Sequence, residues 1–161
     1  MAAKAMFIGS DLAEFMTSPV MMIVGTRDRA GRPDIGRAVG ARTTVDGSGL
    51  ELVVSAWQYG ATIDNLRHGG AIAITFVRPS DYVCYQIKGK ASVSEAGPAG
   101  LVLSARYIAA MTETLALLGV TPEMSGAWLT SREPTLVRVM PEAVFVQTPG
   151  PGAGAALKGA L

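Results

Sequence analysis

The chain has 161 residues, enough for a single domain with a sizeable buried core. Only 17% of the residues are charged and the net charge is +1, so nothing in the charge balance favours nucleic acid or an anionic membrane as a partner. The hydrophobic fraction of 49% is high for so little charge. We therefore expect part of the surface to be an interface, most simply in an oligomer.

The cysteine and histidine content limits the chemistry further. The single cysteine, Cys84, excludes an internal disulfide and fits a reducing compartment. One cysteine and one histidine, His68, cannot supply the three or four ligands of a typical metal site. Neither a signal peptide nor a run of about twenty apolar residues is evident. We expect a cytoplasmic protein with no metal and no membrane span.

The first part of the chain predicts a short helix followed by a meander of three strands. Asp11 is expected to cap the helix, with Glu14 at the capping-box spacing, and Pro19 ends it. Glycine- and proline-containing turns at 29–33 and 46–49 then join successive strands. The predicted strands are 20–28, 34–45 and 50–56.

The second part predicts two further strands, 71–77 and 82–94, and one substantial helix, 98–118, ended by Gly119. Pro141 is expected to divide residues 135–149 into two short strands, and the Gly/Ala-rich tail, 149–161, is expected to be loosely held unless it lies on a partner chain. The buried face of the long helix is predicted to carry Leu101, Ala105, Ile108, Leu115 and Leu118.

These elements predict an α+β protein that is mainly β. Six or seven strands joined mostly by short turns favour an antiparallel barrel with peripheral helices, and the helices do not alternate with strands as in a doubly wound sheet. No repeat or linker divides the chain, so we expect one domain over residues 1–161, with a core at about 10–148.

The segment from Ser55 to Gly70 is the candidate binding site. It predicts a short helix directly after a core strand, and the free N–H groups at a helix start form an anion site. Arg67 is expected about one turn into the helix, and Arg42 with Thr43 is expected beside Ser55 if the hairpin closes at 46–49. A structural reading stays open, in which Thr62 caps the helix, Asn65 satisfies backbone groups and Gly69-Gly70 end the helix.

Three motifs occur in a fixed order: the turn Gly31–Pro33, the "NLR" of Asn65–Arg67 before the strand "AIAITF", and the "IKG" of Ile87–Gly89. In this order and spacing the chain resembles the flavin-binding split β-barrels related to pyridoxamine 5′-phosphate oxidase, over roughly residues 10–95. The resemblance implies a homodimer with two FMN sites at the subunit interface.

The resemblance also implies roles for individual residues. Those expected to hold the phosphate are Arg42, Thr62 and Arg67. Those expected along the ring and ribityl chain are Val54, Ser55 and Ala56. Gln86 and Lys88 are expected to reach the ring edge from one or the other subunit.

The sequence departs from the oxidases proper at three points. The Ser-Arg-Lys run of their phosphate helix is Gly60-Ala61-Thr62 here, Gln86 lies closer to Gly89 than the corresponding glutamine does, and the C-terminal Arg-x-His has no counterpart. We therefore do not expect pyridoxamine phosphate oxidation itself. The prediction is an FMN-dependent oxidoreductase acting on a small organic substrate. The alternatives are a non-catalytic module that binds flavin, deazaflavin or haem, and a cofactor-free dimer.

Three further residues keep two readings each. His68 either contacts a ligand or, as lone histidines near helix ends usually do, the terminal carbonyls. Cys84 is a buried, inert thiol or a redox partner that lacks a second cysteine. Trp128 covers a ring from the partner chain or anchors the packing.

Overall fold

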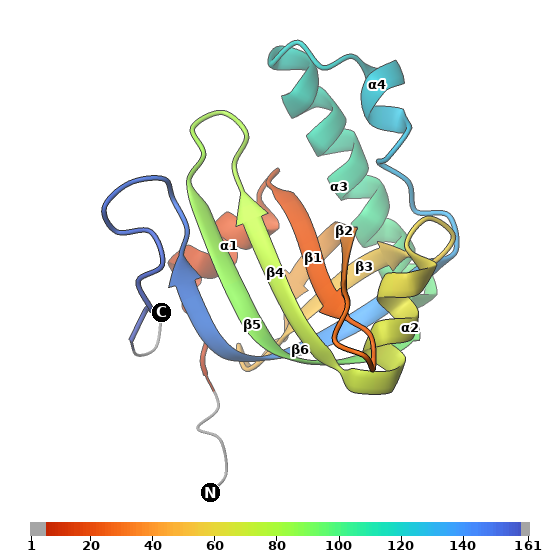
Figure 1. The fold of residues 1–161 in the computed structure, drawn as a ribbon. Coiled ribbons are helices and arrows are strands. Elements are labelled where there is room, and N and C mark those ends of the chain that lie inside the picture. Colours follow the sequence, from red (N-terminus) through yellow and green to blue (C-terminus); the bar gives the residue numbers. More distant parts are fainter. Residues whose placement is uncertain (1–5, 159–161) are drawn as a thin grey trace, which may run out of the picture.

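The computed structural model describes residues 6–158 and shows a closed barrel of six antiparallel strands in the order β1-β2-β3-β6-β5-β4 (Figure 1). The predicted α+β barrel with peripheral helices is thus confirmed. The strands are β1 (Met21–Arg27), β2 (Pro33–Thr43), β3 (Leu50–Ser55), β4 (Ala71–Val77), β5 (Cys84–Glu95) and β6 (Pro134–Val146). The helices are α1 (Ser10–Thr17), α2 (Gly60–Gly69), α3 (Gly97–Leu117) and α4 (Pro122–Gly126).

Alternating burial places one face of β1 and of β4 in the barrel interior. Met22 and Val24 of β1 and Ile72, Ile74 and Phe76 of β4 are buried, while the residues between them are only partly covered. Helices α1 and α2 add their buried side chains to this interior core. Within residues 6–158, no helix combines the length and the hydropathy needed to cross a bilayer.

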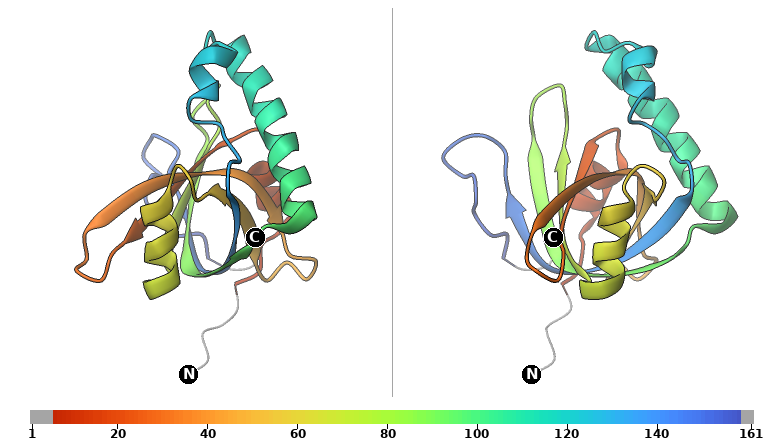
Figure 2. Two further views of the ribbon diagram at one scale, coloured as in Figure 1. Left: turned by 90° about the vertical axis from the view of Figure 1, so that its right-hand side faces the viewer. Right: turned by 45° about the vertical axis from the view of Figure 1, so that its right-hand side comes forward.

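The long helix α3 packs on the outer surface of the barrel, chiefly against β2, and continues with α4 beyond the rim (Figure 2). The expected buried face is largely wrong: Leu115 is buried, but Leu101 is 50% and Leu118 46% exposed. The buried positions are instead Gly100, Ser104, Met111 and Leu115. Apolar residues occur on all sides of this helix, so the sequence period alone does not identify the packed side.

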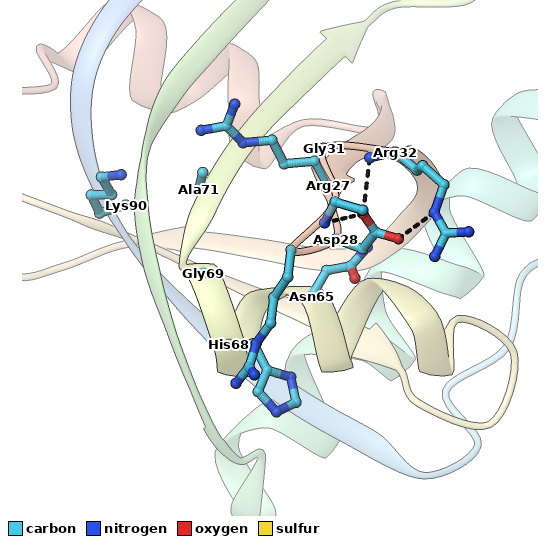
Figure 3. A pocket seen from close by; sticks show the side chains of 11 residues that line it. Arg27, Asp28, Gly31, Arg32, Asn65, His68, Gly69, Ala71 and Lys90 are labelled. Carbon is cyan, nitrogen blue, oxygen red and sulfur yellow. Dashed lines mark hydrogen bonds and ion pairs between the residues drawn. The ribbon is translucent and has the colours of Figure 1, made fainter.

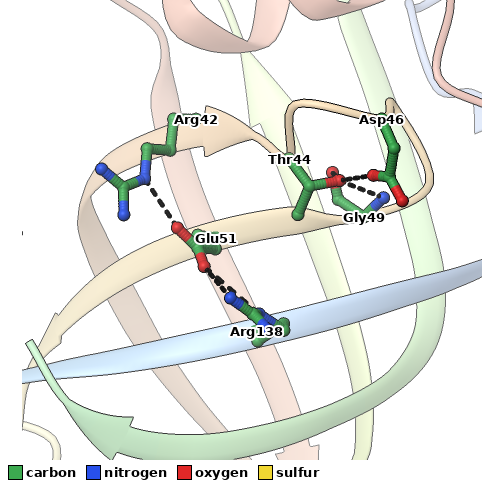
Figure 4. Close-up of polar contacts among 6 residues, drawn as sticks. All are labelled: Arg42, Thr44, Asp46, Gly49, Glu51 and Arg138. Carbon is green, nitrogen blue, oxygen red and sulfur yellow. Dashed lines mark hydrogen bonds and ion pairs between the residues drawn. The ribbon is translucent and has the colours of Figure 1, made fainter.

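Side chains in the turns fix the first two hairpins, as the turn chemistry predicts. In the β1–β2 turn, Asp28 accepts hydrogen bonds from the amides of Ala30 and Arg32 and from Arg32 Nε (Figure 3). In the β2–β3 turn, Thr44 donates to Asp46, whose pKa its hydrogen bonds lower to about 2 (Figure 4). The predicted three-strand meander is therefore confirmed.

Strand β6 corrects the prediction that Pro141 divides this region into two strands. It runs unbroken through Pro141, because a register shift opposite Lys88 and Gly89 accommodates the proline, and a bulge tolerates the missing N–H. The backbones come so close there that a Cβ on Gly89 would overlap the carbonyl oxygen of Met140.

Two smaller expectations also change. Asp11 is not the cap of α1: the N-cap is Gly9, without a side-chain hydrogen bond, and Asp11 lies in the first turn, where the helix dipole favours a carboxylate. The described part of the tail is held by its own chain, since Leu157 N donates to Val144 O at 2.9 Å and Ala156 bridges Phe145. The glycine after α3, Gly119, has the predicted positive φ of 85°.

Candidate functional site

The end of β3 and the start of α2 form the centre of the candidate site. Ser55 is fully buried, and its hydroxyl donates to the carbonyl of Arg132 at 2.6 Å. The amide of Ala56 donates to the carbonyl of Glu133, and Val54 pairs with both β2 and β6. The three residues expected along the ring are therefore immobilised by their own chain, which gives the site a rigid floor.

The N-terminus of α2 is open to an anion. Its N-cap, Tyr59, makes no side-chain hydrogen bond, and the first turn contains no acidic residue. The first amides of a helix have no intrahelical acceptor, and a Cβ at Gly60 would meet no atom within 4 Å. The space beside Gly60 is therefore open next to a helix start, where free amides commonly bind a phosphate.

Arg37 supplies a positive charge beside this helix start. It lies on β2 next to Ala38, which pairs with Val54 on β3. Its guanidinium stacks over the ring of Trp128 with Cζ 4.7 Å from the centroid. The Nη1 atom is buried and has no hydrogen-bond partner in the described part of the chain. A buried, unpaired cationic donor is costly unless a ligand pairs with it.

The amide oxygen of Gln58 is a second buried polar atom without a partner within residues 6–158. Gln58 donates from Nε2 to the carbonyl of Ala127 at 3.3 Å, while its buried Oε1 has no partner within residues 6–158. Arg37 and Gln58 thus hold the adjacent residues Ala127 and Trp128 and each leave one polar atom unsatisfied. These atoms, the bare helix start and the Trp128 ring fit a ligand that carries a phosphate and a flat polar ring.

Two tyrosines near Arg37 are affected by burial. Burial raises the pKa of Tyr59, and Arg37 opposes that rise. Burial also raises the pKa of Tyr107, whose hydroxyl donates to Val20 O at 2.7 Å. Both phenols stay neutral over the physiological range, so neither cancels the charge of Arg37.

Arg42 does not lie where the sequence placed it. The expected position beside Ser55 is wrong, because the hairpin register pairs Arg42 with Glu51 and Thr43 with Leu50. Glu51 lies four residues, about 13 Å, from Ser55 along the strand. In a hairpin, residues at equal distances from the turn face one another. Ala38 pairs with Val54, so the arginine near Ser55 is Arg37. This residue was not among those predicted from the sequence. A lone arginine among small residues in "IGRAVGA" was the available signal.

Four other predicted residues are engaged elsewhere. Thr62 is fully buried and donates to Asp34 Oδ2 at 2.6 Å, so its hydroxyl turns toward β2. Arg67 lies in the last turn of α2, not near its start, and pairs with Asp64. Gln86 donates to Thr75, and Lys88 stacks over Phe145. Within one chain the structure does not bring these residues together at the start of α2.

Arg42 instead belongs to an ion cluster across β2, β3 and β6, in which the side chains of Arg42 and Arg138 are 44% and 61% exposed (Figure 4). Glu51, only 6% exposed, accepts from Arg138 at 2.6 Å and from Arg42 Nε at 2.6 Å. The hydrogen bonds from Arg138 and then Arg42 hold the pKa of Glu51 below its ordinary 4.5, against the effect of burial. The cluster ties three strands together on the outer face of the barrel.

We expect Glu51→Gln to lower the free energy of unfolding at pH 7 by about 1 kcal/mol, because two partly exposed arginines lose their carboxylate. The folded pKa lies below the unfolded one, so this contribution is present above about pH 4.5 and is lost as the pH falls through the folded value. Denaturant unfolding of both proteins from pH 7 to pH 3 should therefore show the difference shrinking toward acid. A constant difference across this range would contradict the assignment.

Comparison with known proteins agrees with this geometry at the level of the fold. No family model and no curated protein matches the sequence. Among solved structures, an F420 reductase superposes with a TM-score of 0.56 at 14% identity, covering 85% of this chain and 98% of the other. A candidate pyridoxamine 5′-phosphate oxidase of Lactobacillus delbrueckii gives 0.54 at 15% identity, covering 87% and 94%.

HutZ, the haem storage protein from Vibrio cholerae, gives a TM-score of 0.51 at 20% identity, covering 88% of this chain and 95% of the other. All three identities are low, so the likeness concerns the fold. The resemblance seen in the sequence is confirmed at this level: the chain has the split β-barrel fold of proteins related to pyridoxamine 5′-phosphate oxidase.

Proposed function

We propose that the protein binds FMN at the start of α2 and is an FMN-dependent oxidoreductase acting on a small organic substrate. The observation that carries the proposal is the buried, unpartnered Nη1 of Arg37 beside a helix start without an acidic residue. A phosphate there would accept from Arg37 and from the free amides at Gly60 and Ala61. Bound FMN would supply the redox chemistry, while the chain supplies anchoring and orientation.

The chain's own groups have supporting roles in this proposal. The Trp128 ring and the half-buried Tyr59 offer apolar faces to a ring system, and Gln58 Oε1 can accept a hydrogen bond from a ring N–H. The rigid end of β3 fixes the distance between the phosphate and the ring. Hydride transfer from a flavin requires no protein acid or base, in keeping with the absence of an obvious catalytic constellation in the sequence.

The proposal also includes a homodimer formed through the outer face of β4 and β5. The outward-facing Ala73 and Thr75 of β4 are uncharged, and no helix lies in front of β4 and β5 in Figure 1. Gln86 pairs with Thr75, and Lys88 pairs with Ala73, so both lie on this same face of the sheet. A homodimer through this face would cover it and bring Gln86 and Lys88 of one chain toward the other.

We expect Ala73→Arg to yield a monomer, since it places a second cation opposite Lys88 within the interface, where like charges repel. Sedimentation equilibrium at several protein concentrations measures the change. Ala109→Arg, on the exposed side of α3, is the matched control and should keep the oligomeric state of the wild type. A wild-type protein that is monomeric at all concentrations, or an Ala73→Arg variant that remains dimeric, would contradict the proposed face.

The test of the cofactor is the visible spectrum of the purified protein after FMN is added and the excess is removed, followed by turnover of reduced nicotinamide with candidate acceptors. Retained flavin bands with turnover support the oxidoreductase. Retained bands without turnover indicate a flavin-binding protein without catalytic activity. Retention of a deazaflavin or a Soret band in place of FMN would replace the cofactor in the proposal, in line with the F420 reductase and HutZ among the similar structures. A protein that retains none of them overturns the proposal. The single, buried Cys84 fits the cytoplasm, where we place this activity.

A further inference from the structure

A separate cavity of about 870 Å³ lies at the other end of α2. It is formed by the β1–β2 hairpin, the last turn of α2 and the facing ends of β4 and β5 (Figure 3). Its volume is in the range of pockets that hold small organic ligands. The ten residues of α2 separate it from the proposed cofactor site by about 15 Å.

The charged groups of this cavity are almost all cationic. Arg27, Arg29, Arg32 and Lys90 line it, together with the only histidine, whereas Asp28 is the only carboxylate among the lining residues of the described chain. The cavity is thus lined by four of the chain's 14 Lys and Arg residues but by one of its 13 Asp and Glu residues. Positive charge is therefore concentrated at this cavity, although the net charge of the chain is only +1.

Asp28 does not neutralise this charge. Its carboxylate accepts from the amides of Ala30 and Arg32 and from Arg32 Nε at 2.7 Å, and these bonds hold its pKa below the ordinary value. It therefore balances Arg32 alone. No carboxylate of residues 6–158 lies within ion-pair distance of Arg27, Arg29 or Lys90. Figure 3 shows Lys90 across the cavity from the Asp28–Arg32 pair.

Uncharged groups add room and hydrogen bonding. Gly69 and Ala71 are small, and a Cβ on Gly69 would meet no atom within 4 Å. His68 Nδ1 contacts the carbonyl of Asp64 at 2.7 Å and so acts as the donor, which leaves Nε2 free to contact a ligand. Asn65 donates to Thr26 and keeps its amide oxygen.

We propose that this cavity binds an oligo-anionic small molecule, one carrying at least two phosphate or carboxylate groups, and that Arg27, Arg29 and Lys90 hold it. Two or more anionic groups are needed because the three unpaired cations lie on β1, in the hairpin and on β5, and one compact anion would leave some of them unpaired. The competing explanation is that these cations only balance the negative C-terminal end of the α2 dipole. The site does not depend on the proposed cofactor.

The single histidine makes the proposal directly testable. The carbon-bound ring protons of His68 give the only histidine signals of the full-length protein, so their chemical shifts report on this cavity. Pyrophosphate and citrate, titrated at fixed pH and constant ionic strength, are the two probes, because one carries phosphates and the other carboxylates. We expect a saturable shift with at least one probe, and which of them binds identifies the source of the anionic groups.

Arg29→Gln and Lys90→Gln should each weaken this binding about tenfold, since each removes one charge-assisted contact. Arg106→Gln is the control, because this exposed arginine of α3 lies outside the cavity and pairs with no carboxylate within residues 6–158. Shifts that do not saturate with either probe, or an Arg106→Gln effect as large as the other two, would overturn the proposal. FMN binding by the same samples, measured separately, reports only on the start of α2.

Discussion

Gly89→Ala is expected to lower the free energy of unfolding by about 3 kcal/mol. The added Cβ would overlap the carbonyl oxygen of Met140 and lie about 3.0 Å from its carbonyl carbon. Both atoms belong to the backbone of β6, so no side chain can rotate away. The register shift beside Pro141 would have to move instead.

Chemical denaturation at one protein concentration measures this effect. Gly25→Ala is the matched control, since it also adds a methyl group to a strand glycine but at ordinary contact distance, 3.6 Å from Ala73 O. It should change stability by less than about 0.5 kcal/mol. Equal effects of the two substitutions would show that strand propensity, and not the close approach of β5 and β6, explains the loss.

Arg37→Met is expected to weaken FMN binding about a hundredfold and to stabilise the cofactor-free protein by about 1 kcal/mol. The two changes have opposite signs for one reason. Without a ligand the buried Nη1 is an unsatisfied donor, whereas with a phosphate it becomes a charge-assisted hydrogen bond. Methionine keeps the packing on Trp128 and removes the donor.

Fluorescence titration with FMN and thermal unfolding of the free protein measure the two parts. Arg67→Met is the control, because this arginine lies in α2, whose start forms the proposed site, but is exposed and pairs with Asp64. The affinity of this variant for FMN should change less than about twofold. Unchanged FMN affinity in Arg37→Met together with a less stable free protein would assign Arg37 a structural role on Trp128. A large loss in Arg67→Met would instead restore the residue chosen from the sequence.

The fold was predictable where local chemistry decides it. Turns rich in glycine, proline and aspartate placed the hairpins, and Gly70, with a φ of 65°, ends α2 as the alternative reading foresaw. The packed side of α3 was not predictable, because that helix is apolar all round. The prediction that Pro141 divides β6 was wrong for a related reason. The neighbouring strand accommodates the proline through a register shift, which no local sequence pattern indicates.

The candidate site shows the same limit. The segment after β3 was identified correctly as a strand that feeds a short helix, but its arginine was not. Choosing between Arg37 and Arg42 requires the strand register, and a register shift between Ala38 and Ala41 alters it. Whether a side chain is already satisfied, as Thr62 is by Asp34, depends on residues 28 positions apart in sequence. Such pairings are tertiary and cannot be read from residue order.

The position of β6 has a consequence for how the chain folds. This last strand pairs with both β3 and β5, and it alone closes the barrel. Until residues 134–146 have left the ribosome, the hydrogen-bonding edges of β3 and β5 have no partner, and these are the edges at which foreign strands add. Between the synthesis of β5 and that of β6 the nascent chain therefore has two open strand edges, and closure depends on long-range contacts, which form slowly.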